Sequence, residues 1–267
     1  LVQVMIPSSV TQICEFAFFG CRFLKSIEFS VDSKLCTIEK SAFAGSSITN
    51  IKIPSKVTQI CEESFYECTK LKEIEFSENS EINSIGKNAF SKSSIEKFSV
   101  PSSVAEISEA AFSECMNLVS VEFTENSKLH SIECKVFFKS AIKSISVPST
   151  VEQICEHAFA ECDKLVSVVF AGDSQLALIE RFAFAKSAIL KILIPAKVRQ
   201  ICESGFQGCS KLSSIEFCQG SEIENIDKFA FSGTSISNIT IPSRVRKINE
   251  SVFSDCKNLK SVEFLPD

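Results

Sequence analysis

The sequence predicts an α/β solenoid of about eleven stacked coils, with a curved parallel β-sheet on the concave side and short helices or 3-10 turns on the convex side. Two observations predict this fold. Prolines recur at a constant step of 47 residues, and each 47-residue unit consists of two similar halves. Periods of roughly 20 to 50 residues are typical of solenoids, in which each coil stacks on its neighbours. We therefore expect one domain over residues 1–267, and the absence of an initiator Met indicates a fragment of a larger protein.

The repeat is strict and keeps its register through the whole chain. The first half of a unit follows V-xx-I-xxxx-F-xx-C-xx-L-xx-I-x-F from Val10 to Phe29, and the second follows L-xx-I-xxxx-F-xx-S-x-I-xx-I-x-I from Leu35 to Ile53. The 24 Phe residues, against one Tyr and no Trp, indicate one buried position that is filled many times. The prolines of the six copies are Pro7, Pro54, Pro101, Pro148, Pro195 and Pro242.

The combined pattern L-xx-I-x-I-P…V-xx-I…A-F-xx-C-xx-L resembles the BspA-like, treponemal-type leucine-rich repeats of bacterial and parasitic-protist surface proteins. The resemblance covers essentially the whole chain and implies a leucine-rich-repeat solenoid. It also implies attachment to host cells or matrix proteins. One position departs from the family pattern, because the Gly that often follows the Ile before A-F is kept only at Gly86, and residues such as Cys14 and Glu39 replace it elsewhere. This departure leads us to expect a more helical convex side.

Each coil should contain one strand and one turn or helix. Residues 24–29 alternate with a period of two, so Ile27 and Phe29 should point inward and Ser26 and Glu28 outward. Stacking brings such strands together as a parallel sheet. Residues 14–18 have helical spacing, with an acidic residue in the first turn where it favours the helix dipole. A short helix or 3-10 turn is therefore expected there.

A column of charged residues follows the convex side and alternates in sign from coil to coil. Neighbouring coils should lie about 4.8 Å apart, so opposite charges should lie side by side. We interpret the column as a ladder of exposed ion pairs that helps to set register, with a gap at Cys134. Its members are Glu15, Lys40, Glu62, Lys87, Glu109, Cys134, Glu156, Arg181, Glu203, Lys228 and Glu250.

The thirteen cysteines do not form a recognisable metal or disulfide pattern. The column that begins at Cys21 recurs only in alternate coils, so its thiols should lie about 10 Å apart, beyond the ~7 Å limit for a disulfide and out of reach of tetrahedral zinc. Cys155 and His157 are two residues apart and do not face one another on a helix. His130 and Cys134 share no other catalytic partner. We predict no catalytic residue, no metal ligand and no cofactor, and thiols that pack as small buried groups.

The outward strand positions are polar in most coils and apolar in two neighbouring coils. Apolar side chains at equivalent outward positions should form one contiguous patch, and such patches often mark contact sites. Drift of a surface under little constraint is the alternative interpretation. We hypothesise a partner contact at Val166, Val169, Leu190 and Leu193, flanked by Glu122, Lys191 and Glu216.

The lack of a catalytic constellation favours a non-enzymatic protein-binding module that uses the concave sheet face for recognition, and the resemblance implies an adhesion module of a BspA-like cell-surface protein. The alternative is an intracellular leucine-rich-repeat scaffold or regulatory protein in the cytoplasm, which thiols without disulfides favour. A net charge of -5 and the lack of a basic stripe argue against a nucleic-acid partner. No window reaches the ~18 consecutive apolar residues that span a bilayer, so this fragment should not insert into membranes. We expect a protein ligand, for which the resemblance implies a host cell-surface or matrix protein.

Overall fold

The computed structural model describes residues 2–124 and 126–266. Leu1, Glu125 and Asp267 lie outside the described residues. The chain divides into two compact units, Leu1–Leu129 and His130–Asp267, which are built from the same kind of coil. The expectation of one domain over residues 1–267 stays a prediction.

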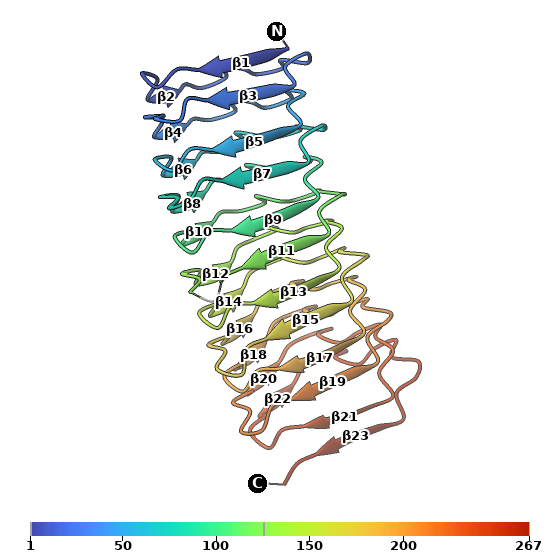
Figure 1. Ribbon diagram of the computed structural model, residues 1–267. Helices are drawn as coiled ribbons and strands as arrows, with labels where there is room; N and C mark the ends of the chain where they lie inside the picture. Colours follow the sequence, from blue (N-terminus) through green and yellow to red (C-terminus); the bar gives the residue numbers. More distant parts are fainter. Residues whose placement is uncertain (1, 125, 267) are drawn as a thin grey trace. The chain divides into compact units, whose positions relative to one another are not determined.

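In the first unit, a coil carries one four-residue strand and one two-residue strand, which form two separate rows (Figure 1). All the pairings within each row are parallel. The long strands are β1 (Gln3–Ile6), β3 (Ser26–Phe29), β5 (Asn50–Ile53), β7 (Glu73–Phe76), β9 (Lys97–Val100) and β11 (Ser120–Phe123). The short strands are β2 (Gln12–Ile13), β4 (Thr37–Ile38), β6 (Gln59–Ile60), β8 (Ser84–Ile85) and β10 (Glu106–Ile107).

The second unit repeats this arrangement, again with parallel pairing in both rows. Its long strands are β13 (Ser144–Val147), β15 (Ser167–Phe170), β17 (Lys191–Ile194), β19 (Ser214–Phe217), β21 (Asn238–Ile241) and β23 (Ser261–Phe264). Its short strands are β12 (Ser131–Ile132), β14 (Gln153–Ile154), β16 (Leu178–Ile179), β18 (Gln200–Ile201), β20 (Asn225–Ile226) and β22 (Lys247–Ile248). The predicted parallel sheet of stacked strands is therefore confirmed in each unit.

The inner residues of the coils form a continuous core in each unit. The second residue of a long strand, such as Ile51 or Ile192, is buried, while the first and third residues face solvent. The repeated Phe of the turns stack on one another, with ring centroids 5.2 Å apart between Phe43 and Phe65 and 5.1 Å apart between Phe184 and Phe206. This confirms that one buried aromatic position is filled many times. Because each coil contacts only its neighbours, the stack of rings links the coils into a cooperative core.

The predicted helices or 3-10 turns are wrong, since the described residues form consecutive turns and no helix on the side opposite the long strands. Two residues per coil, four apart, have positive φ, as at Phe16 (56°) and Gly20 (63°), which a right-handed helix excludes. The Phe18 amide donates to the Ala42 carbonyl of the next coil at 2.7 Å. Alternate amides thus bond between coils instead of along a helix.

The amides between them bond three residues back, as from Ala17 to Cys14. The helical spacing of residues 14–18 was therefore misleading, because backbone pairing between stacked coils overrides local preference. With no helix among residues 2–124 and 126–266, no helical segment there is long and apolar enough to cross a membrane.

Candidate functional site

The second unit exposes four aliphatic side chains where strands β15 and β17 pair. Val166 is 40% exposed, Val169 53%, Leu190 45% and Leu193 51%. Val166 and Leu190 directly precede the two strands, and Val169 and Leu193 are their third residues. Ser167 pairs with Lys191, so the parallel register brings Val169 opposite Leu193. We call Val166, Val169, Leu190 and Leu193 the apolar patch.

The alternation of inward and outward residues along β15 and β17 keeps Val169 and Leu193 exposed to solvent. Val168 and Ile192 are buried, and successive residues of a strand point to opposite faces. Val169 and Leu193 therefore cannot turn inward without expelling the core residues that precede them. The Leu190 amide donates to the Val166 carbonyl at 3.2 Å, which fixes the two coils against each other at the start of the patch.

A hollow of about 560 Å³ opens beside the patch at the ends of β15 and β17. Val169 and Leu193 form one wall, and loop residues 171–175 and 195–197 form much of the rest. The ammonium group of Lys197 donates to the side-chain oxygen of Gln175 and joins the two loops. A hollow of this size falls within the roughly 300–1,000 Å³ range of ligand pockets. It has room for a side chain of a bound partner.

Of the three charged residues predicted to flank the patch, Lys191 and Glu216 lie in the second unit and Glu122 lies in the first. Lys191 begins β17, and Glu216 is the third residue of β19, where it pairs in register with Leu193. The Ser214 hydroxyl donates to the Glu216 carboxylate at 3.0 Å. Glu122 is an exposed residue of β11 in the first unit, so its place beside the patch stays a prediction.

Four cysteines of the repeated column, Cys68, Cys115, Cys162 and Cys209, pack as small buried groups as predicted, whereas Cys21 and Cys256 at its two ends are half-buried. No disulfide joins the thirteen cysteines of the described residues. The thiol of Cys162 donates to the Phe137 carbonyl at 2.9 Å and lies 3.6 Å from the Ser140 hydroxyl oxygen. Burial raises the pKa of the Cys162 thiol to about 12. A thiol that stays protonated at neutral pH is a poor nucleophile, so Cys162 has a packing role.

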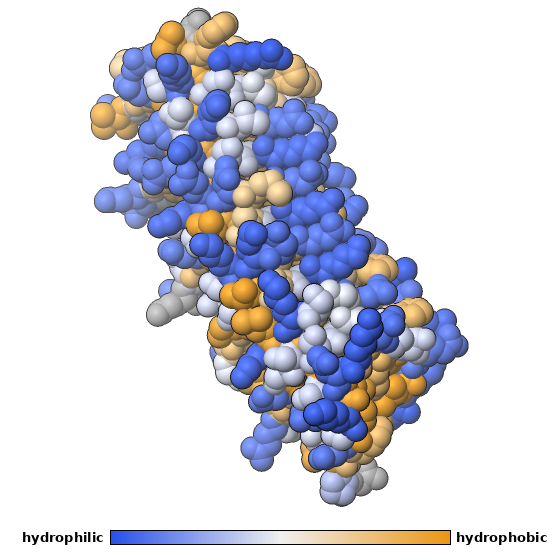
Figure 2. Space-filling model, turned by 90° about the vertical axis from the view of Figure 1, so that its right-hand side faces the viewer, coloured by the Kyte–Doolittle hydropathy of each residue, from blue (hydrophilic) through white to orange (hydrophobic). Residues whose placement is uncertain are grey.

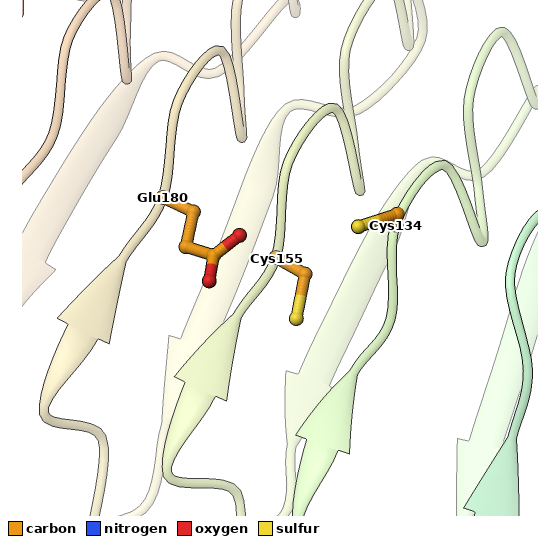
Figure 3. Close-up of side chains that lie close together, drawn as sticks. All are labelled: Cys134, Cys155 and Glu180. Atoms are coloured by element: carbon orange, nitrogen blue, oxygen red, sulfur yellow. The ribbon is translucent and has the colours of Figure 1, made fainter.

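A second group of cysteines comes together in a way that the sequence reasoning missed. Cys134, Cys155 and Glu180 follow three successive short strands of the second unit, and their ligand atoms all lie within 4.8 Å of one another (Figure 3). Cys134 belongs to a different column from Cys21, and its one available signal was the gap that it makes in the charge ladder.

The family model described as the BspA type leucine rich repeat region matches residues 1–119, 83–212 and 177–266, in six copies. The chain belongs to this family. The structure is similar to a leucine-rich repeat protein from Bacteroides ovatus, with 24% identity and a TM-score of 0.67, over 98% of this chain and 80% of that one. It is also similar to the pneumococcal vaccine antigen PcpA, with 22% identity and a TM-score of 0.55, over 91% and 73% of the two chains. No curated protein matches the sequence.

The BspA-type coils carry the predicted charge ladder on the side opposite the long strands. Four cations of this column each pair with the Glu of the same column that lies 22 residues later. These pairs are Lys40–Glu62 at 3.1 Å, Lys87–Glu109 at 2.7 Å, Arg181–Glu203 at 3.4 Å and Lys228–Glu250 at 3.5 Å. The hydrogen bond that Lys40 donates to the Glu62 carboxylate, together with the charge of Glu62, raises the pKa of Lys40. The ladder is exposed and repetitive, which fits a role in register more than in binding.

Figure 2 shows one face on which hydrophilic residues predominate and hydrophobic residues form small separate groups. A cluster of four exposed aliphatic side chains on adjoining strands is therefore a local departure from the chemistry of the repeat.

Proposed function

We propose that the chain is a non-enzymatic protein-binding module of a BspA-type cell-surface protein, and that the apolar patch is its contact site. The observation that carries this proposal is a group of four aliphatic side chains, each 40% to 53% exposed, which lie at the third residue of β15 and of β17 and directly before these strands. Burying them against a partner would remove apolar surface from water, which is the main favourable term in protein association. Rigid neighbouring strands would make that surface available with little ordering cost.

The chemistry of the surroundings supports a polypeptide partner. The hollow beside Val169 and Leu193 can take one apolar side chain, while Lys191 and Glu216 offer charges of opposite sign at the edge. Such charges fix orientation and exclude wrong partners more than they add affinity. The family and the likeness to a pneumococcal vaccine antigen support a host cell-surface or matrix protein as the ligand class.

A second function has one observation in its favour. Thirteen cysteines without a disulfide fit a reducing compartment better than an oxidising one. The same patch would then serve an intracellular scaffold or regulatory protein. Surface labelling of intact cells of the source organism, followed by detection with an antibody against this chain, separates the two locations.

Binding of the chain to immobilised extracellular-matrix proteins and to intact host cells tests the proposal. The test variant combines Val169→Glu with Leu193→Ser, residue types that occupy the same strand position in other coils. The control combines Glu28→Gln with Lys52→Ser at the matching position of the first unit. We expect the patch variant to lose at least about tenfold in affinity, as for hot-spot residues, and the control to keep it. Wild-type affinity in the patch variant, or no binding by the wild-type chain, would overturn the proposal.

A further inference from the structure

The side chains of Cys134, Cys155 and Glu180 converge from three successive coils of the second unit. Cys155 directly follows β14 and Glu180 directly follows β16, while Cys134 lies two residues after β12. Figure 3 shows the Cys134 side chain and the Glu180 carboxylate directed toward Cys155 from either side. Cys155 is buried and the other two are half-buried, so the group lies at the edge of the core with access to solvent.

Neighbouring donors hold two of the three side chains. The Gln153 side-chain amide donates to the Cys155 sulfur at 3.1 Å. The backbone amide of Glu156 donates to one carboxylate oxygen of Glu180 at 2.9 Å. Donors of this kind orient metal ligands and stabilise their anionic forms. The second carboxylate oxygen of Glu180 can then serve as a ligand.

The charge around Cys155 favours a cation at this place. The carboxylates of Glu133 and Glu180 lie close enough to Cys155 to act electrostatically on its side chain. Carboxylates that oppose a thiolate attract a metal ion. The local sequence also departs here from the rest of the charge column, because Cys134 stands where other coils carry Glu, Lys or Arg.

We propose that Cys134 Sγ, Cys155 Sγ and a Glu180 carboxylate oxygen bind one zinc ion, with water as the fourth ligand. Sulfur and oxygen ligands at about 2.3 Å and 2.0–2.2 Å from a tetrahedral zinc lie roughly 3.3–3.8 Å from one another. The three ligand atoms lie within 4.8 Å of one another, so inward shifts of about 1 Å close the site. On binding, each thiol gives its proton to solvent and its sulfur lone pair to the metal.

Zinc in this position would connect three consecutive coils. The stability of a solenoid depends on contacts between neighbouring repeats, so an ion that bridges three of them should raise the melting temperature of the second unit. The proposal therefore assigns the ion a structural role that is independent of the apolar patch.

The test measures zinc and cobalt binding by the whole chain, stripped with a chelator and reduced with a phosphine that contains no thiol. We expect one equivalent of metal, a cobalt spectrum with thiolate charge-transfer absorption, and a higher melting temperature with zinc. Cys134→Lys and Glu180→Gln should each weaken binding by at least about tenfold. Cys134→Lys places the same residue type as Lys40, Lys87 and Lys228 at the equivalent position, so we expect it to fold.

Cys61→Ser is the matched control. Cys61 holds the same place in the repeat as Cys155, and Glu39 lies near it, but the described residues gather no second thiol there into a three-ligand group. Alkylation of Cys134 and Cys155, followed by peptide mapping, gives a readout in the wild-type chain, and zinc should protect both thiols. No bound metal, equal affinity in Cys134→Lys, or alkylation rates unaffected by zinc would overturn the proposal.

Discussion

Strands β3 and β5 of the first unit and β15 and β17 of the second occupy the same place in the repeat but present different surfaces. They are separated by three 47-residue units, or 141 residues. Both pairs have the same register, with Ser26 opposite Asn50 in one and Ser167 opposite Lys191 in the other. The outward residues of the first pair are Lys25, Glu28, Thr49 and Lys52, and those of the second are Val166, Val169, Leu190 and Leu193.

The hollows beside the two strand pairs correspond as well. Glu28 and Lys52 border a hollow of about 470 Å³ in the first unit, and Val169 and Leu193 border one of about 560 Å³ in the second. The backbone frame is thus set by the inward residues, which are alike in both units. The outward residues vary without changing that frame, so differences in binding between coils must come from side chains that the fold does not constrain.

The largest effect is expected from substitutions in the stacked Phe core, which test whether the two units share the same kind of core. Phe43 and Phe184 are both fully buried, and each lies between two stacked rings at 5.1–5.2 Å. Phe43→Ala and Phe184→Ala should each lower the free energy of unfolding by about 3–5 kcal/mol, because each leaves a cavity in the ring stack. Urea denaturation measures this loss. A clear difference between the two variants would show that the units do not share one kind of core.

A smaller effect is expected for the buried thiols of the coils that follow those of Phe43 and Phe184. Cys68 and Cys209 donate to the carbonyls of Phe43 at 3.1 Å and of Phe184 at 3.0 Å. Burial raises the pKa of each thiol to about 11. Cys68→Ala and Cys209→Ala should each lower the free energy of unfolding by about 1–2 kcal/mol, since a buried carbonyl loses one of its two donors, keeping the amide of Ser46 or Ser187, and a small gap remains.

The matched control for the thiols is the exposed Cys14, whose change to Ala should leave the unfolding midpoint within error. Equal midpoints for the Cys14 and Cys209 variants would contradict a packing role for the buried column.

The smallest effect on stability is expected where the two regions differ most. Val169→Glu and Leu193→Lys give the second unit the residues that the first unit carries at these positions, Glu28 and Lys52. Each exchange should change the free energy of unfolding by no more than about 0.5 kcal/mol, because the side chains are exposed. Denaturation curves of the two variants measure the change. A loss comparable to that of the Phe variants would mean that the patch stabilises the fold instead of binding a partner.

Much of this structure could be predicted because the repeat supplies many independent copies of each position. The buried Phe column, the exposed pairing of Lys40 with Glu62 and the outward direction of Val169 all followed from register alone. The conformation of the convex segments could not be predicted from the register of the repeat. Residues 14–18 read as a helix by themselves, and only the neighbouring coil shows that the Phe18 amide bonds to Ala42.

The residues of the apolar patch could likewise be predicted from the sequence, whereas the group of Cys134, Cys155 and Glu180 could not. Periodicity identifies which side chains face solvent, so the four members of the apolar patch could be named from the sequence. Periodicity does not give the distances between residues of different columns. The proximity of Cys134, Cys155 and Glu180 could therefore not be predicted from the sequence. The hollow beside the patch also depends on how loop residues 171–175 and 195–197 lie against the strands.

The sequence by itself determined the number of coils, the residues that face the core, the thiols that pack there and the sign of each charge along the ladder. The tertiary structure alone decided that the turns would not be helical and that two thiols and a carboxylate would converge. The physical reason is that a repeat specifies which residues lie on which face. Hydrogen bonds and contacts between different columns depend instead on how adjacent coils dock, and that becomes fixed only when the coils stack.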